Sequence, residues 1–395
     1  MDRAWRVAIV KDTSRPMLGL HALHVGPRGL PGVDVVALVD GNPRDLERKV
    51  AATGARRHYP ALAPMLAAER PDVVILCSRH PDDHLPQITA AAEAGCHIYC
   101  EKPLCASLDE ADQIIALAER HGVYVSMAHP ARHALAWRTM AQRLAAGHIG
   151  RPLTAIARGK CDHRGGGEDL VVLGTHMLDA MAWMLGPPSA VGSEVSLAGR
   201  PVTRADRATT VEPIGPCAGD HVYAWFRFAN DVRGVFESRR GLFTPPGPPL
   251  WMGLTICGTE GALSMRFCDS AEPRPQLLHS AGRGPLEDHH DWQPVELIEH
   301  RSIAGAQPLD YALCGQPDIP GARFFLEANR FALWDLLGAI EQKRQPECNA
   351  QHARTVVEMI QGIYAAHLER RVVTFPLAER RHPLTLPDRP TEPAD

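Results

Sequence analysis

The sequence predicts an α/β protein with an N-terminal parallel sheet and a C-terminal α+β domain whose open sheet is largely antiparallel. In residues 5–128, short and almost continuously apolar runs alternate with helical patterns, as in a parallel sheet buried on both faces. After Met127, strand-like stretches follow one another with turns between them, which favours antiparallel pairing. The length of 395 residues also predicts two domains, because a single core seldom grows beyond about 300 residues.

The apolar runs of the first half place its strands in order. We expect strands at Val7–Val10, Val33–Val39, Val73–Leu76, His97–Cys100 and Val123–Met127. Ser107 and Glu110 have the spacing of a capping box, and Gly122 suits the end of a helix that runs from there to about His121. By its pattern this half, residues 1–128, is a dinucleotide-binding domain of the Rossmann type.

The second half, residues 129–383, is expected to begin with a helix over Leu135–Ala146. Strands are expected at Leu153–Arg158, Val222–Phe228, Gly234–Ser238, Leu254–Cys257 and Ala262–Phe267. The Pro-rich segment Thr244–Pro249 and the polar segment Ser280–Trp292 are predicted loops. Two later helices are indicated by apolar faces, formed by Leu333, Leu337 and Ile340 and by Val356, Ile360, Ile363 and His367. Residues 384–395 are expected to form a flexible tail.

Composition excludes several classes of function. A net charge of −4 provides no basic footprint for nucleic acid, and no apolar run approaches the length of a membrane span. The N-terminus lacks the apolar core of a signal peptide. The ten cysteines include no Cys-x-x-Cys pair, and several lie within expected core strands. We therefore expect reduced, buried thiols and a cytoplasmic location.

The tripeptide Glu101-Lys102-Pro103 is the most informative local feature. It follows directly on the expected strand His97–Cys100, so Lys102 would face the crevice where open α/β sheets bind ligands. Its ammonium can hold a substrate hydroxyl or exchange a proton with it. Pro103 would stiffen the turn that presents the lysine.

Two segments resemble motifs of the glucose–fructose oxidoreductase, inositol dehydrogenase and rhizopine-catabolism (Gfo/Idh/MocA) family. Residues 94–104, which include Cys-Glu-Lys-Pro, are similar to the family's "AGKHVLCEKP" segment. Residues 173–179, with Trp183 and Gly186, resemble its "D-x-G-x-H-x-x-D…W-x-x-G" block, and the two matches follow in the family's order. The resemblance extends diffusely over residues 5–385.

This resemblance implies a dehydrogenase that uses NAD or NADP and a secondary alcohol of a sugar, glycoside or cyclitol. It also implies that a partner subunit covers the open sheet, as in a homodimer or homotetramer. Two alternatives remain open. The same fold could retain NAD for a transient oxidation during glycoside cleavage or epimerisation, or the chain could be a non-enzymatic sensor or scaffold that no longer binds the cofactor.

The expected phosphate loop departs from the family. A dinucleotide site normally has Gly-x-Gly-x-x-Gly after the first strand, but this chain has no glycine between Val10 and Gly19. Lys11 or Arg15 can neutralise phosphate charge, or the loop no longer binds pyrophosphate tightly. Asp40 ends the second strand, where a carboxylate accepts from the adenosine ribose, so NAD is favoured over NADP. The cofactor ligands implied by the resemblance are Asp12, Thr13, Ser14, Asp40, Ser78, Glu101 and Lys102.

The substrate side is expected to centre on His176, on a helix with Thr175 as its N-cap. The resemblance implies that His176 faces the nicotinamide as acid/base or substrate ligand. Since a histidine exchanges protons near neutral pH and a lysine is a poor base there, His176 is expected to be the base and Lys102 the donor that polarises the hydroxyl. Val172 stands where the family has an aspartate, so Glu168 and Asp169 are expected to take over that role, and the three glycines before them suggest backbone close to a ligand.

The remaining candidates lie in polar segments. The other expected substrate ligands are Lys160, His129 and Arg132. The charged segment 158–164 suits a polyol, or is a solvated loop. Asp288-His289-His290-Asp291 consists of adjacent groups without a distant partner, so no metal site is predicted.

Overall fold

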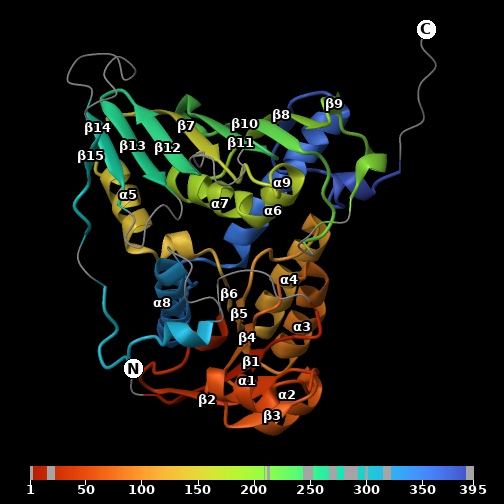
Figure 1. Ribbon diagram of the computed structural model, residues 1–395, viewed down its shortest axis with the longest axis vertical. Helices are drawn as coiled ribbons and strands as arrows, with labels where there is room; N and C mark the ends of the chain where they lie inside the picture. Colours follow the sequence, from red (N-terminus) through yellow and green to blue (C-terminus); the bar gives the residue numbers. More distant parts are fainter. Residues whose placement is uncertain are drawn as a thin grey trace.

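The computed structural model describes residues 3–15, 23–208, 210, 214–242, 252–266, 274–279, 292–298, 301–314 and 322–387. Two sheets lie one above the other along the long axis of the molecule, with the N-terminal sheet at the lower end in Figure 1. In the described part of the chain, no helix combines the length and apolar character required to span a bilayer.

The first sheet has six parallel strands in the order β3-β2-β1-β4-β5-β6. They are β1 (Trp5–Val10), β2 (Val33–Val39), β3 (Arg57–Tyr59), β4 (Val73–Leu76), β5 (His97–Cys100) and β6 (Val125–Met127). Four helices alternate with them: α1 (Leu46–Thr53), α2 (Leu62–Glu69), α3 (Pro81–Glu93) and α4 (Leu108–His121). The predicted Rossmann-type sheet is confirmed. Its strand order reverses between β1 and β4, which makes the carboxyl ends of these two strands the expected ligand crevice.

Helix α4 begins and ends where the sequence predicts. The Ser107 side chain accepts from the Glu110 amide at 3.3 Å, and Gly122 follows the last turn with φ 65°. The Glu110 carboxylate accepts from the Ala106 amide at 2.8 Å instead of the Ser107 amide. The reciprocal half of the capping box is therefore shifted by one residue.

The second sheet has ten strands, in the order β15-β14-β13-β12-β7-β11-β10-β8-β16, with β9 paired to β8. They are β7 (Pro152–Arg158), β8 (Ala190–Leu197), β9 (Arg200–Pro201), β10 (His221–Arg227), β11 (Arg233–Arg239), β12 (Gly253–Gly258), β13 (Gly261–Arg266), β14 (Gln276–His279), β15 (Gln293–Pro294) and β16 (Val373–Thr374). Antiparallel pairing prevails as predicted. The exception is β7 with β11, which run parallel.

Helices cover one face of the second sheet and fill the space between the sheets (Figure 1). They are α5 (Leu135–Ala145), α6 (Gly167–Val172), α7 (Gly174–Leu185) and α9 (Ala350–Glu369). Helix α9 packs on β8 and α7 of the upper part and also on α4 of the lower part. The main hydrophobic cluster therefore runs without interruption from one sheet to the other.

Helix α8 (Ala322–Gln342) returns to the first sheet although it lies late in the chain. Its residues Ala332, Leu333, Leu336 and Leu337 join the cluster formed by β1, β2, β4 and β5. The hydroxyl of Tyr99 donates to the side-chain oxygen of Asn329 at 2.9 Å, a buried bond between this helix and β5. One face of the parallel sheet is thus covered by residues more than 200 positions downstream.

The predictions for the C-terminal tail, the loops and the cysteines can also be compared with the structure. The flexible tail predicted from residue 384 is wrong for residues 384–387, because Leu384 is buried and Thr385 donates to the carbonyl of His382. Residues 388–395, the predicted loop at 244–249 and the segment 288–291 lie outside the described residues. The eight described cysteines are free thiols, seven of them buried.

Candidate active site

Lys102 lies just after β5, and its side chain is buried. The ammonium donates to the backbone carbonyl of Val172 at 2.8 Å. Helix α6 ends at Val172 and α7 begins at Gly174, and the His176 amide donates to Leu173 at 2.9 Å instead of reaching back to Val172. The break between the two helices thus leaves the Val172 carbonyl available to the lysine. At position 172, where the resemblance would lead one to expect an aspartate, the oxygen that meets Lys102 comes from the main chain.

His176 lies in the first turn of α7 and is also buried. Its ring centroid is 5.6 Å from that of His129, in an edge-to-face arrangement, and 6.1 Å from that of Phe325. The prediction that Thr175 is the N-cap is wrong, because Leu173 precedes the helix and makes no side-chain cap. The Thr175 hydroxyl instead lies 3.0 Å from Nε2 of His129. The threonine therefore joins the helix that carries His176 to the segment after β6.

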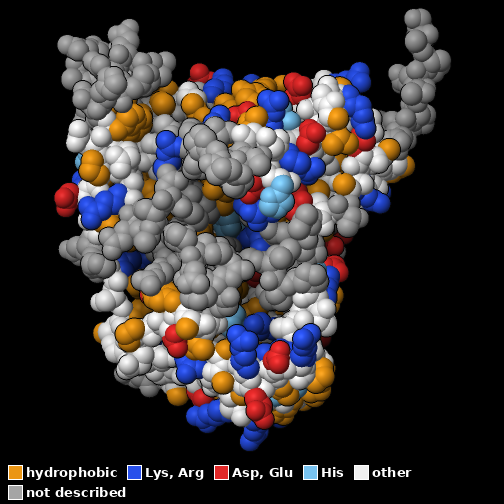
Figure 2. All heavy atoms as spheres, viewed as in Figure 1, with side chains coloured by type: hydrophobic (Ala, Val, Ile, Leu, Met, Phe, Trp, Pro, Cys, Tyr) orange, Lys and Arg blue, Asp and Glu red, His pale blue; other side chains and the backbone are white. Residues whose placement is uncertain are grey.

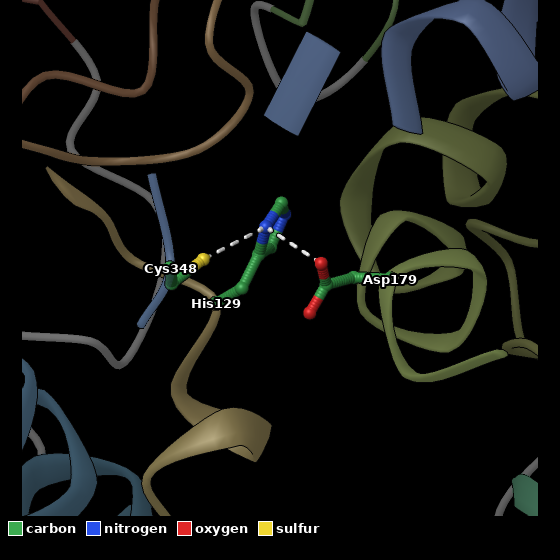
Figure 3. A group of neighbouring side chains, drawn as sticks. All are labelled: His129, Asp179 and Cys348. Carbon is green, nitrogen blue, oxygen red and sulfur yellow. Dashed lines mark hydrogen bonds and ion pairs between the residues drawn. The ribbon is translucent and has the colours of Figure 1, made fainter. Parts of the chain in front are cut away.

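His129, Asp179 and Cys348 form a buried cluster beside this helix (Figure 3), and the buried Arg132 adjoins it at Asp179. Nδ1 of His129 is 3.6 Å from a carboxylate oxygen of Asp179 and 3.9 Å from the Cys348 sulfur. The Arg132 guanidinium donates to both Asp179 oxygens at distances of 2.8 to 3.1 Å. Burial disfavours ionisation of Asp179, but the Arg132 charge outweighs it and holds the pKa of that carboxyl below its usual value.

A histidine, an aspartate and a cysteine together are typical of a metal site, but the charges around this cluster argue against a bound metal ion. His129, Asp179 and Cys348 bring one ligand atom each within 4.8 Å of one another. Burial raises the pKa of the Cys348 thiol, which favours the protonated form. A divalent ion would also need Asp179, whose two oxygens already accept from Arg132. The Arg132 guanidinium already supplies the positive charge that a metal ion would bring. Arg132 was predicted to bind substrate, but its side chain is directed at Asp179.

Asp169, on α6, is fully buried against the second sheet. Its Oδ2 accepts from the Lys160 amide at 2.6 Å and from the Ser238 hydroxyl at 2.8 Å. Burial raises the pKa of this carboxyl to about 6, although Lys160 and the Ser238 hydrogen bond act in the opposite direction. Glu168, beside it, is buried as well. Both predicted carboxylates are therefore interior groups in the first turn of α6, the helix that ends at Val172 and directly precedes the helix of His176.

The three glycines before Glu168 allow close contact with backbone of the second sheet domain. A Cβ on Gly165 would lie 2.5 Å from backbone of Arg239, and one on Gly167 would lie 2.1 Å from the carbonyl oxygen of Ala218. Gly166 has φ 87°, a conformation that side chains rarely adopt. The chain itself occupies the space beside these glycines, so its own packing accounts for them, and the expectation that they bring backbone close to a ligand stays a prediction.

The cofactor side of the crevice is organised by Asp40, just after β2. Its buried carboxylate accepts from the Thr13 hydroxyl at 2.7 Å, the Thr13 amide at 3.3 Å and the Asn42 amide at 3.0 Å, and Lys49 lies 3.2 Å away. Burial raises the pKa of Asp40, but these hydrogen bonds outweigh it and hold the pKa below its usual value. Asp40 thus keeps its charge and anchors the loop after β1.

The same loop is held on its other side by the residues after β4. Arg15 donates to Asp83 at 2.6 Å and to Asp82 at 3.2 Å, and the Ser78 hydroxyl donates to Asp83 at 2.7 Å. Asp12 accepts from the Ser14 amide at 3.1 Å. After β5, the Glu101 carboxylate accepts from the Lys102 amide at 3.0 Å. The predicted cofactor residues therefore gather at the carboxyl ends of β1, β2, β4 and β5, an arrangement that fits a dinucleotide.

Sequence reasoning missed several residues of these networks. Asn42, Lys49 and Asp83 organise the loop, and Ser238 positions Asp169. Asp83 had a signal, since Pro81-Asp82-Asp83 is the pattern of a helix start. The other three have no local signature.

Lys, Arg and His side chains also gather on the face shown in Figure 2, at the level of α6 and α7 in Figure 1.

Comparison with known families gives two matches on this chain. Residues 18–129 match a family described as "Oxidoreductase family, NAD-binding Rossmann fold", and residues 137–264 match the "GFO/IDH/MocA C-terminal domain". The first match covers most of the parallel sheet with Lys102 and His129. The second covers α6, α7 and the middle of the open sheet, including Val172 and His176.

Curated relatives are similar over part of their length. D-apiose dehydrogenase of Paraburkholderia graminis is 29% identical over 46% of this chain and 51% of its own. D-glucoside 3-dehydrogenase of Escherichia coli is 28% identical over 40% of this chain and 48% of its own. The chain thus spans about half the length of the curated relatives it matches.

Solved structures resemble nearly the whole chain. A levoglucosan dehydrogenase in complex with NADH and levoglucosan has a TM-score of 0.69 at 17% identity, covering 94% of this chain and 100% of that chain. The aldose-aldose oxidoreductase of Caulobacter crescentus has the same TM-score at 19% identity and the same coverage. At such identities the likeness is one of fold.

Proposed function

The chain belongs to the Gfo/Idh/MocA oxidoreductase family, and we propose that it transfers hydride between a nicotinamide dinucleotide and a secondary alcohol of a sugar, glycoside or cyclitol. The observation that carries this proposal is the contact of Lys102 with Val172 at 2.8 Å, at the break that begins the helix of His176. It brings the lysine from β5 of the cofactor domain against the helix of the substrate domain. The named relatives act on sugar-like alcohols, which supports the substrate class.

Lys102 and His176 have different tasks in this proposal. When bound, the nicotinamide supplies the hydride acceptor. Lys102 donates a hydrogen bond to the substrate hydroxyl and fixes its position, a task that suits an ammonium group better than accepting a proton does. His176 accepts the hydroxyl proton as the alcohol is oxidised, since an imidazole exchanges protons readily in this range. Asp169, Glu168 and Lys160 form the substrate side, and His129 and Arg132 hold the helix of His176 in place.

We propose NAD as the preferred cofactor, with NADP weaker. Asp40 keeps a negative charge at the end of β2, where the adenosine ribose of a dinucleotide lies in this kind of fold. A carboxylate disfavours a 2′-phosphate at that position. Lys49 offsets part of this charge from 3.2 Å, so the preference should be modest.

We further propose that the enzyme is a homodimer or homotetramer. The outer face of the open sheet carries Ile156 on β7, 39% exposed, and Tyr223 on β10, 44% exposed, with Trp225 partly covered beside them. Charged residues such as Arg158 and Glu237 lie among them. A large sheet face with apolar side chains and mixed charges suits a self-complementary contact.

The function is tested by cofactor binding followed by a substrate screen. Purified protein should bind NADH in calorimetry, and a panel of sugars, glycosides and cyclitols with NAD should give reduced nicotinamide absorbance for at least one class. Tight retention of NAD through purification without net reduction would favour transient oxidation. Absence of binding to either NADH or NADPH would overturn the dehydrogenase proposal.

A further inference from the structure

Lys11 occupies the central position of the cofactor crevice. It follows the last residue of β1, and its amide donates to the carbonyl of Val39 on β2 at 2.9 Å. On the other side, the Cys77 amide donates to the carbonyl of Val10 at 3.0 Å. Lys11 therefore lies at the point where the strand order reverses, between the ends of β1 and β4, where open α/β sheets bind their ligands. In a glycine-rich loop this position would have no side chain.

The donors that a phosphate loop usually offers are already in use here. A glycine loop directs backbone N–H groups at the pyrophosphate. In this chain the Thr13 amide donates to Asp40 at 3.3 Å, and the Ser14 amide donates to Asp12 at 3.1 Å. Asp12 and Asp40 thus take up two amides of the loop, and a bound diphosphate would need another source of positive charge.

Arg15 is a poor source of that charge. Its guanidinium donates to Asp83 at 2.6 Å and to Asp82 at 3.2 Å. Two carboxylates thus surround one arginine, and the net charge of the group is negative. The arginine fastens the loop to the start of α3.

The ammonium of Lys11 is differently placed. The side chain is half-buried, and within the described ranges no hydrogen bond or ion pair of its ammonium is formed. The nearby carboxylate, Asp40, is shared among Thr13, Asn42 and Lys49. Burial lowers the pKa of Lys11, while Cys77 and Asp40 act in the opposite direction. His24 adds no positive charge beside Lys11 at neutral pH, because burial and the Lys11 charge lower its pKa to about 3.

We infer that the Lys11 ammonium binds the pyrophosphate of the dinucleotide and replaces the backbone donors of a glycine loop. This inference rests on the proposed function. A lysine is a compact point charge that can meet a phosphate oxygen from the end of a strand without the close backbone approach that glycine allows. A desolvated cation without a matched anion is unfavourable, so the diphosphate would supply the charge that the protein leaves unmatched.

The test is direct binding of probes with and without phosphate. Replacing the lysine in Lys11→Met should weaken NADH and ADP by about 10- to 100-fold, the scale of one charged hydrogen bond. Adenosine should bind the variant and the wild type equally well. Lys11→Arg should recover most of the NADH affinity. Arg48→Met, which removes an exposed positive charge on α1, serves as the matched control and should bind NADH as the wild type does.

Folding and function are separated within the same experiment. Without NADH the Lys11→Met protein should unfold at the same or a higher temperature than the wild type, because a half-buried charge is removed. Equal NADH affinity of Lys11→Met and wild type would overturn the inference alone, and so would an equal loss of adenosine binding. If the wild type itself bound neither NADH nor NADPH, the proposed function would fall and the inference with it.

Discussion

The ammonium of Lys102 donates to the main-chain carbonyl of Val172 across the boundary between the two sheets, at 2.8 Å. A bond to a backbone oxygen positions the lysine without adding a charge beside it. This differs from a lysine–aspartate pair, in which the carboxylate would stabilise the ammonium and favour its protonated form. The contact therefore serves to position the ammonium, and the proposed proton-transfer role of His176 rests on the imidazole itself.

Lys102→Met should reduce turnover by about 10²- to 10⁴-fold, the usual effect of removing a positioned donor or acid/base group. The substitution also leaves the Val172 carbonyl without the ammonium, which costs about 1–3 kcal/mol of stability. Steady-state kinetics and thermal unfolding measure the two effects. Lys343→Met, a change of an exposed lysine after α8, is the control. Unchanged turnover in folded Lys102→Met protein would refute the assignment.

His176→Ala should also lose about 10²- to 10⁴-fold in turnover while NADH affinity changes little, because proton transfer is lost and cofactor contacts are kept. The limb of the pH–rate profile that reports the catalytic base in the wild type should disappear. His148→Ala, in the turn that follows α5, should leave the rate unchanged. A rate loss with an unaltered pH profile would show that His176 has only a structural role.

Asp179→Leu should lower the free energy of unfolding by about 3–5 kcal/mol, because it leaves the buried Arg132 guanidinium without its partner. Combining it with Arg132→Met should restore much of that stability, since no uncompensated charge then remains. Denaturant unfolding of both variants provides the measurement. The control is Glu379→Gln, whose partner Arg381 is exposed, with an expected loss below about 1 kcal/mol. Similar losses at both sites would contradict the burial argument.

Asp169 should make the protein less stable as pH rises. Its pKa is raised from 3.8 to about 6 by burial, so the folded protein holds its proton more strongly than the unfolded chain. The stability associated with the neutral carboxyl is fully present below pH 3.8 and is lost as pH rises through 6. Asp169→Asn should remove this loss, and its advantage over the wild type should grow by about 3 kcal/mol between pH 4 and pH 7.

The matched control for that measurement is Asp162→Asn. Burial opposes ionisation of Asp162, but Arg164 holds its pKa below the usual value. The charged carboxylate therefore contributes its full stabilisation above pH 3.8, so the difference between Asp162→Asn and wild type should be nearly flat between pH 4 and pH 7, with the wild type the more stable. A flat difference between Asp169→Asn and wild type across this range would argue against a neutralised carboxyl.

The sequence predicted those elements whose signals are local. Strands Val33–Val39, Val73–Leu76 and His97–Cys100 have the predicted bounds, because buried parallel strands form continuous apolar runs. Helix α4 also has its predicted limits, since a serine cap and a glycine stop mark both ends. The fold class followed from the same alternation.

Contacts between distant segments could not be predicted in this way. The parallel pairing of β7 with β11 joins strands about 80 residues apart and leaves no pattern in either one. Thr175 had the residue type of an N-cap, but α6 already begins at Gly167, so the chain enters α7 from a helix and not from a loop. The Lys102 contact involves a backbone oxygen, which every residue type at position 172 would offer, so the identity of residue 172 gives no signal for it.

The return of α8 to the parallel sheet has a consequence for synthesis on the ribosome. Strands β1 to β6 leave the exit tunnel first, but the helix that covers their Tyr99 side is translated nearly 200 residues later. Until then, apolar side chains such as Ile9, Leu38 and Ile75 lack the cover that Leu333 and Leu336 provide in the finished molecule. The nascent N-terminal half is thus a natural client for chaperones that shield exposed apolar surface, and a fragment expressed without residues 322–342 should aggregate.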